Sequence, residues 1–170
     1  MRKITCICLI VLLASCSVQK QKGLVYFNDF ESVKGWAPIW LTKKIAHSGL
    51  FSNQVDSTHI YGASFKQLFR EISDNKIVKI KASLWLYLPA KAQGKLVLEV
   101  RKPNDSVKLW TCKDFTEIAP KIGQWQEAKV EFTLPDSVIK PANIICVYPW
   151  GINKSLFYVD DMRLEFVLGY

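Results

Sequence analysis

Hydrophobic and polar residues alternate with a period of two along several short stretches of this chain. In residues 78–86 every second residue is Val, Ile, Leu or Ala, and residues 96–101 and 127–134 alternate in the same way. This period is typical of β-strands that bury one face. No long stretch has the 3.6-residue period of an amphipathic helix, so the pattern predicts a chain made of strands.

Segments rich in Pro, Gly, Asn, Asp or Ser separate the apolar runs. They cover residues 89–94, 102–106, 135–137 and 150–155, and their composition favours turns. About ten short strands joined by close turns are typical of an antiparallel β-sandwich. We therefore expect an all-β fold, with a jelly roll as the natural way to close the sandwich.

The first residues have the pattern of a secretory signal. Met1-Arg2-Lys3 precede an apolar run over residues 4–14, which Ser15 and Cys16 follow. A basic start, a short apolar core and small residues before a cleavage point are typical of such signals. The run is shorter than the roughly 20 residues that a membrane-spanning helix needs.

Residues 13–16, Leu-Ala-Ser-Cys, also resemble the lipobox of bacterial lipoproteins. The resemblance implies cleavage before Cys16 and attachment of acyl chains such as palmitate to it, which would anchor the mature chain in a membrane. Ser17 is not the Asp of an inner-membrane retention signal, so the outer membrane is favoured. The tether lacks the acidic cluster of surface-export signals, which favours the periplasmic leaflet slightly. An ordinary signal peptide with a chance cysteine is the alternative.

This interpretation divides the chain into three parts. They are a lipoprotein signal peptide (1–15), the lipidated cysteine with a polar tether (16–22) and one jelly-roll domain (23–170). The length of the last part suits a single domain. It is also sufficient to bury a core without disulfides or metals.

Charge and cysteine content narrow the range of partners. The net charge is +8, and the lysines are scattered rather than clustered. A solvated surface explains that distribution better than a nucleic-acid patch, so no nucleic-acid partner is expected. Of five cysteines, only Cys112 and Cys146 follow the predicted anchor. An exported compartment permits a disulfide between them, and two separately buried thiols are the other interpretation.

Two acidic segments lie near opposite ends of the predicted domain. The first is Asn-Asp-Phe-Glu, ending at Glu31. In the second, the even positions of residues 156–166 are apolar except for Asp160, which predicts a carboxylate on the core-facing side of a strand. Such a burial is costly unless something compensates the charge. If the first and last strands are neighbours, Glu31 and Asp160 could share one calcium ion.

These segments also carry a family resemblance. Residues 28–31, Gly-Trp at 35–36, Ala-His-Ser-Gly at 46–49 and Tyr-Val-Asp-Asp at 158–161 together resemble the carbohydrate-binding modules of the galactose-binding-like jelly-roll group. The match spans residues 24–166 and is specific at its two ends. It implies a jelly roll that binds carbohydrate and does not catalyse a reaction.

The resemblance also implies a structural calcium ion. By position, its side-chain ligands are Glu31 and Asp160, and Asp29 and Ser48 are candidates through their backbone carbonyls. The alternative is that Asp160 and its neighbour Asp161 cap a strand or pair with lysines. The resemblance further places Trp36 and Trp125 at positions that serve packing.

Aromatic residues indicate where a ligand would bind. Trp85 and Tyr87 fall on the polar side of their predicted strand, and large rings on a polar face are unfavourable unless they are used or covered. We expect one exposed platform on which a sugar ring stacks, with two polar side chains beside it to bind hydroxyl groups. Its residues are Trp85, Tyr87, Trp110, Trp150, Glu99 and Arg101. The alternative is that a loop or the other sheet covers this face.

The sequence lacks the motifs of common enzymes. It has no Gly-x-Ser-x-Gly, His-Glu-x-x-His, P-loop or dinucleotide fingerprint. Glu127 and Glu131 share a strand face with Lys129, which indicates a charge-balanced surface rather than a glycosidase pair. Three Asp-Ser pairs, at residues 56–57, 105–106 and 136–137, resemble bacterial O-glycosylation sites, although turn chemistry also explains them.

Three functions fit these patterns. The first is a lipid-anchored, non-catalytic glycan-binding module stabilised by calcium. Its partners would be a glycan or polysaccharide, the membrane through the lipid anchor and other envelope proteins. The second is an envelope lipoprotein of the same fold that binds protein or acts as a scaffold. The third is a small glycan-active enzyme, which two carboxylates converging in a cleft would support.

Overall fold

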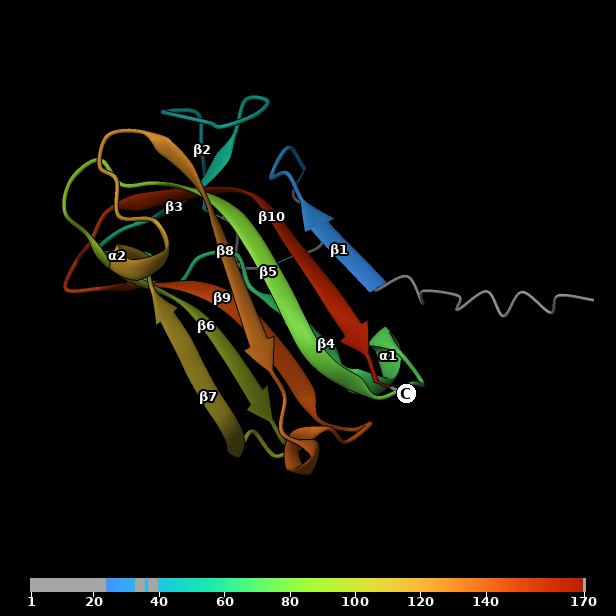
Figure 1. The fold of residues 1–170 in the computed structure, drawn as a ribbon. Helices are drawn as coiled ribbons and strands as arrows, with labels where there is room; N and C mark the ends of the chain where they lie inside the picture. Colours follow the sequence, from blue (N-terminus) through green and yellow to red (C-terminus); the bar gives the residue numbers. More distant parts are fainter. Residues whose placement is uncertain (1–23, 33–35, 37–39, 170) are drawn as a thin grey trace, which may run out of the picture.

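The computed structural model describes residues 24–32, 36 and 40–169, and within them ten strands form two antiparallel sheets (Figure 1). The predicted signal peptide, Cys16 and the tether lie outside the described residues. The strands are β1 (Leu24–Asn28), β2 (Leu41–Thr42), β3 (Ser52–Val55), β4 (Phe65–Leu68), β5 (Ile77–Tyr87), β6 (Gln93–Arg101), β7 (Val107–Asp114), β8 (Trp125–Thr133), β9 (Ile144–Ile152) and β10 (Phe157–Leu168). Single turns of helix are α1 (Phe69–Ile72), α2 (Phe115–Ile118) and the 3-10 helix η1 (Asp136–Val138). No helix in this part of the chain is long and apolar enough to cross a membrane.

The two sheets pack face to face as the layers of a sandwich, which confirms the predicted all-β architecture (Figure 1). The larger sheet has the order β2-β3-β10-β5-β8, with β1 pairing to β10 beside β3. The smaller sheet has the order β4-β9-β6-β7. The first and last strands are therefore neighbours, with Leu24 opposite Phe166, which meets the condition set for a shared calcium site.

The hydrophobic core lies between the sheets and follows the predicted alternation. Leu84 and Leu86 of β5 and Leu96 and Leu98 of β6 are fully buried and face one another across the sandwich. Full burial of such side chains contributes about 1.5–3 kcal/mol each. Trp36 also packs into this core, as expected, with its ring edge-on to Phe65 at 5.4 Å.

A β-bulge in β10 corrects the predicted orientation of Asp160. The pairing with β5 shifts between Asp160 and Arg163, and Asp161 has a φ of 45°. A bulge adds one residue to a strand and reverses the alternation beyond it. Met162 and later even residues face the core, whereas Tyr158 and Asp160 point to the outer face. The continuous core-facing row predicted over residues 156–166 was therefore wrong.

Strand bounds also differ from the predicted breaks, most clearly at residues 150–155. The segment 150–155 was expected to be a turn, but β9 continues to Ile152. Trp150 therefore belongs to a strand, and its side chain has a defined face. The difference arises because Pro149 and Gly151, which resemble turn residues, sit within the paired strand, on positions that face the core side.

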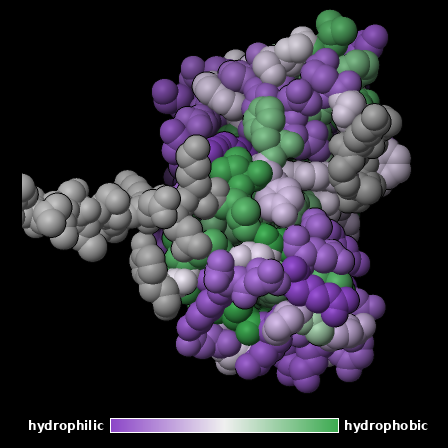
Figure 2. All heavy atoms as spheres, turned by 90° about the vertical axis from the view of Figure 1, so that its right-hand side faces the viewer, coloured by the Kyte–Doolittle hydropathy of each residue, from purple (hydrophilic) through white to green (hydrophobic). Residues whose placement is uncertain are grey.

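Two exposed apolar side chains lie on the edge strand β1. Val25 is 48% exposed and Phe27 is 55% exposed. Figure 2 shows the side of the molecule that carries β1, where apolar atoms gather between two hydrophilic regions. This side is one of the surfaces where a protein partner could be sought.

Candidate functional site

The outer face of the smaller sheet collects aromatic and charged side chains from several strands. In β6, Leu98 and its even-numbered neighbours point into the core, so Val97, Glu99 and Arg101 point outward. Val97 is nevertheless fully buried, although it is not part of the core between the sheets. Side chains on the outer face must therefore cover it.

Strand register brings four aromatic residues to this surface. Trp110 of β7 lies directly opposite Glu99. Tyr148 and Trp150 of β9 lie opposite outward-pointing residues of β6, and Tyr61 forms a bridge to Trp150. We call the surface formed by Tyr61, Trp110, Tyr148 and Trp150 the aromatic face.

The rings of the aromatic face touch one another in two orientations. Tyr61 stacks on Trp150, with 6.3 Å between ring centroids and 22° between the planes. Trp110 meets Trp150 edge-on, at 6.1 Å and 82°. Trp110 is 45% exposed and Tyr61 is 46% exposed. Trp150 thus stands at the centre of a continuous aromatic surface that is open to solvent.

An ion pair between a buried carboxylate and a partly exposed arginine lies beside these rings. Glu99 is only 2% exposed, and its Oε1 accepts a hydrogen bond from Nε of Arg101. Its Oε2 accepts a hydrogen bond from the Tyr148 hydroxyl at 3.0 Å. Burial, together with this bond, raises the pKa of Tyr148 to about 12, and the bond to Glu99 raises the pKa of Arg101. Two donors therefore hold the Glu99 carboxylate and fix its orientation.

A pocket of about 320 Å³ opens beside this pair. Its lining residues are Tyr61, Ser64, Arg101 and Tyr148. The pocket therefore combines two phenol rings with a hydroxyl and a guanidinium group. Rings and hydrogen-bonding groups in this combination suit a ligand that has apolar C–H faces and polar edges, such as a sugar.

Two carboxylates on the strands of this face, Glu99 and Asp114, can be compared with a glycosidase pair. Asp114 lies opposite Lys95 and pairs with it at 2.7 Å. Glu99 and Asp114 are separated by four residues of strand, or roughly 13 Å. That exceeds the roughly 5–10 Å between catalytic carboxylates. Glu99 and Asp114 therefore do not form such a pair.

The structure corrects the predicted single platform. Trp110, Trp150, Glu99 and Arg101 lie together on the smaller sheet. Trp85 and Tyr87 belong to β5 and therefore to the outer face of the larger sheet. The alternation of residues along each strand correctly identified these rings as outward-facing. The alternation could not show that β5 and β6, although consecutive, belong to different sheets.

A loop covers Trp85 on the larger sheet. His47 stacks on it, with 3.6 Å between ring centroids and 13° between the planes. Tyr87 packs against Trp125 at 5.6 Å and against Tyr158 at 6.2 Å. Both predicted ligand-binding rings are thus half-buried by their own neighbours. Trp125 has a packing role, as expected, on this outer face.

The predicted platform did not include two residues of the aromatic face. Tyr61 precedes β4 and reaches this face through a single bridge to Trp150, which no local pattern indicates. Tyr148 did carry a signal, because it lies two residues before Trp150 and alternate residues of a strand share a face. Treating Trp150 as a turn residue concealed that relation.

The structure also shows where the predicted ion-pair surface and the two cysteines lie. Lys129 pairs with Glu127 at 2.7 Å on the outer face of the larger sheet, as the charge-balanced interpretation predicted. Cys112 and Cys146 are free thiols on β7 and β9. Strand β6 lies between them, so their Cα atoms are about 10 Å apart, too far for a disulfide.

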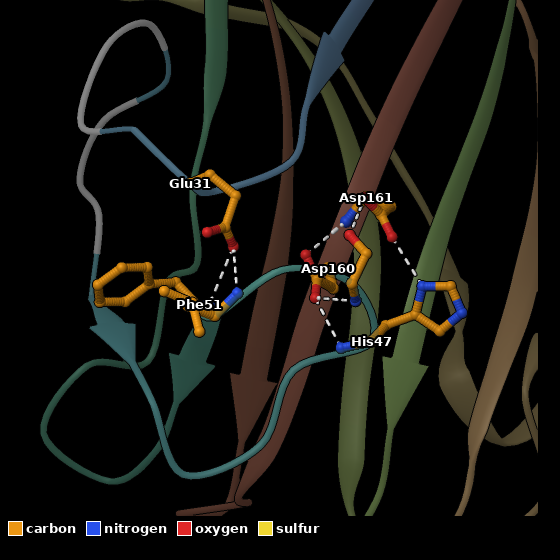
Figure 3. A network of polar contacts seen from close by, with 7 residues as sticks. Glu31, His47, Phe51, Asp160 and Asp161 are labelled. Carbon is orange, nitrogen blue, oxygen red and sulfur yellow. Dashed lines mark hydrogen bonds and ion pairs between the residues drawn. The ribbon is translucent and has the colours of Figure 1, made fainter.

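The first acidic segment closes against the loop that follows β2. Glu31 Oε1 accepts hydrogen bonds from the backbone N–H groups of Leu50 and Phe51, both at 2.9 Å (Figure 3). A Cβ at Gly49 would collide with this carboxylate, and the φ of Gly49 is +59°. The Ser-Gly turn is therefore required for Glu31 to approach the loop.

The second acidic segment holds the same loop. Asp160 is fully buried, and its Oδ2 accepts the N–H groups of His47 and Ser48 at 2.8 and 3.3 Å (Figure 3). Its Oδ1 accepts the N–H of Asp161 at 2.9 Å. Burial raises the pKa of Asp160 to about 6, against the lowering effect of these bonds. The Asp161 carboxylate binds His47 Nδ1 at 2.7 Å and the Ser48 hydroxyl at 2.9 Å.

The predicted calcium ligands can be compared with this arrangement. A carboxylate has about four acceptor sites, and the described N–H bonds use two on Glu31 and three on Asp160. Asp29 uses its side chain to accept the Glu31 N–H, at 3.1 Å, which leaves its backbone carbonyl as the predicted donor. Among the described residues, no group of three His, Cys, Asp or Glu could hold a metal ion. A calcium ion here would need both carboxylates together with backbone carbonyls, such as those predicted for Asp29 and Ser48.

Sequence comparisons give no relatives, whereas structural comparisons do. No protein-family model matches the chain, and no curated protein matches it. The CBM22-1 xylan-binding domain from Paenibacillus barcinonensis Xyn10C is similar in structure, with a TM-score of 0.61 and 15% sequence identity. The similarity covers 88% of this chain and 98% of that domain.

Two further family 22 modules are similar. The CBM22-2 xylan-binding domain of the same Paenibacillus barcinonensis protein has a TM-score of 0.57 at 16% identity, over 84% of this chain and 99% of that one. The C-terminal family 22 carbohydrate-binding module of Clostridium thermocellum Xyn10B has a TM-score of 0.55 at 16% identity, over 83% of this chain and 91% of that one. At these identities the similarity concerns the fold: the chain is a two-sheet antiparallel β-sandwich that matches the CBM22 jelly roll.

Proposed function

We propose that this protein is a lipid-anchored, non-catalytic module that binds a polysaccharide on the aromatic face. The observation that supports this most directly is the arrangement around Trp150. Two exposed rings flank it, and the buried Glu99 carboxylate, oriented by Arg101, lies alongside. Aromatic anchors beside fixed polar groups are the usual composition of a binding hot spot.

The similar structures favour a plant-type polysaccharide as the first ligand to test. Three of them are described as xylan-binding or carbohydrate-binding modules of the same fold. Fold alone does not determine function, so the argument rests on the residues of the aromatic face. Rings at different angles around Trp150 suit an extended chain of sugars, in which successive residues present their C–H faces differently.

Affinity electrophoresis tests this proposal. The purified protein, with Cys16→Ser so that it remains unlipidated, would be run through native gels that contain xylan, mannan, a mixed-linkage β-glucan or no polysaccharide. We expect retardation in the xylan gel relative to albumin as a non-binding control. Unchanged migration in every polysaccharide gel would count against glycan binding.

One observation favours a second candidate function, a protein-binding scaffold. Strand β1 pairs with β10 alone among the described strands and exposes Val25 and Phe27 beside that free edge. An edge strand with exposed apolar residues can accept a strand from a partner. If the protein binds none of the polysaccharides, charged substitutions at Val25 and Phe27 would be the next variants to examine in co-purification experiments.

The lipid anchor is part of the proposal and yields its own prediction. Its support is the signal at residues 1–16, and Leu24 at the start of β1 follows Cys16 by only eight residues. Cys16→Ala should move the protein from the membrane fraction to the soluble fraction, because two or more acyl chains are needed for stable anchoring. Fractionation after a carbonate wash measures this. A variant that stays with the membranes would contradict lipidation at Cys16.

Calcium is the remaining part of the proposal. Its support is that Glu31 and Asp160, from opposite ends of the domain, bind the same loop over residues 47–51. An ion between them would compensate two carboxylates and tie the first and last strands to that loop. The Discussion gives the test, because its expected effect on stability is large.

A further inference from the structure

The aromatic face carries more positive than negative charge at its Arg101 end. Lys66 of β4 lies opposite Cys146 on this face, one strand away from Glu99. Lys102 follows Arg101 and contacts Lys108, whose pKa it lowers. The carboxylates near Arg101 are Glu99 and Asp105. This end of the face therefore has four cationic side chains and two carboxylates.

Two of the cations on this face are already paired with carboxylates. Lys95 binds Asp114 at 2.7 Å, and Arg101 binds Glu99. Among the described residues, no carboxylate lies within ion-pair distance of Lys66, Lys102 or Lys108. The surplus charge is therefore available to a ligand that is itself anionic.

Arg101 is also placed to bind an anion directly. Its guanidinium carries five N–H donors, and the described bond to Glu99 uses the Nε–H alone. Its side chain is 38% exposed and lines the pocket with Tyr61, Ser64 and Tyr148. Terminal guanidinium nitrogens beside hydroxyl groups match the planar geometry of a carboxylate.

We propose that the polysaccharide is acidic, and that a uronic-acid carboxylate binds the Arg101 guanidinium in this pocket while neighbouring sugars stack on Tyr61 and Trp150. The inference rests on the proposed glycan-binding function and specifies its substrate class. Lys66 adds positive charge from β4, which lies across β9 from Arg101. A neutral polysaccharide could stack on the rings, but it would give the unpaired lysines no anionic partner.

The direct test compares one polymer with and without its charge. Wild-type protein would be titrated calorimetrically with glucuronoxylan and with the same preparation after chemical reduction of its carboxyl groups to neutral alcohols. Charge-assisted hydrogen bonds favour the native polymer by about tenfold in affinity. Raising the salt concentration from 0.05 to about 0.5 M should reduce that preference, because exposed charges are screened.

This titration distinguishes a failure of the acidic-ligand inference from a failure of the proposed glycan binding. Equal binding of native and reduced polymer would overturn the acidic-ligand inference and leave glycan binding intact. If the protein bound neither polymer, both the acidic-ligand inference and the proposed glycan binding would be overturned for xylan-type ligands. A further titration with polygalacturonate would show whether the carboxylate preference extends to another backbone.

Two lysine substitutions supply a matched control on the protein. Lys66→Gln removes an exposed charge from the aromatic face, and Lys81→Gln removes one from the outer face of the larger sheet. We expect Lys66→Gln to weaken binding of the native polymer two- to threefold and to leave the reduced polymer unaffected. Lys81→Gln should change neither. Equal effects of the two substitutions would show that net charge, and not the site, governs the preference.

Discussion

Trp150→Ala should reduce the affinity for the polysaccharide about thirtyfold. Trp150 contacts both neighbouring rings, at 6.3 Å to Tyr61 and 6.1 Å to Trp110, so its removal breaks the continuous aromatic surface. Central aromatic residues of a binding site are worth about 2 kcal/mol or more, which corresponds to that factor. Calorimetric titration measures the affinity. Thermal unfolding of the same sample establishes that the variant is folded.

Trp85→Ala is the matched control for this variant. Trp85 is an outward-facing tryptophan of similar setting, but it lies on the larger sheet and is stacked on His47. Its loss should lower the melting temperature somewhat and leave the affinity unchanged. If Trp85→Ala abolished binding while Trp150→Ala did not, the ligand would have to bind on the larger sheet, contrary to our assignment.

Asp160→Ala should destabilise the domain by about 3 kcal/mol or more. Its carboxylate is fully buried and accepts N–H groups from His47, Ser48 and Asp161. Each buried donor left without a partner costs about 1–3 kcal/mol. Urea unfolding in chelator measures this loss apart from any metal. Asp136→Ala is the control, because that carboxylate is 79% exposed and pairs with Lys76 at the surface.

The calcium proposal makes a separate prediction for the same proteins. An ion that binds only the folded state adds about 2.7 kcal/mol when its concentration is a hundred times Kd. Wild-type protein should therefore melt at a higher temperature in calcium than in EDTA, and Asp160→Ala should melt at the same temperature in both. Identical wild-type melting curves in calcium and in EDTA would contradict the calcium proposal. Glu31 and Asp160 would then act as acceptors for backbone N–H groups alone.

The secondary structure of this chain could be predicted because local patterns determine it. Period-two alternation correctly placed β5, β6 and β8, and the breaks between them held turn residues. The pairing of β1 with β10, which the shared calcium site required as a condition, is present. These features depend on residues that are close in sequence, or on motifs that stand at both ends of the domain.

The features that escaped prediction depend on long-range pairing. Whether Trp85 and Glu99 share a face depends on the sheet to which each strand belongs, and nothing near either residue encodes that. The bulge at Asp161 reversed the face of Asp160, although the sequence there continues to alternate. Tyr61 entered the site through a bridge to a residue far along the chain. The candidate site was therefore half predictable: its outward rings, but not their grouping.

The indole N–H signals of the tryptophans test the central claim most directly. Trp110 and Trp150 lie on the outer face of the smaller sheet, and Trp85 and Trp125 lie on that of the larger sheet. Isotope-labelled protein would be titrated with a soluble xylan oligosaccharide and followed by two-dimensional NMR. The aromatic face predicts that the signals of Trp110 and Trp150 shift in proportion to binding, while those of Trp85 and Trp125 stay in place. Shifts confined to Trp85 and Trp125 would contradict the account.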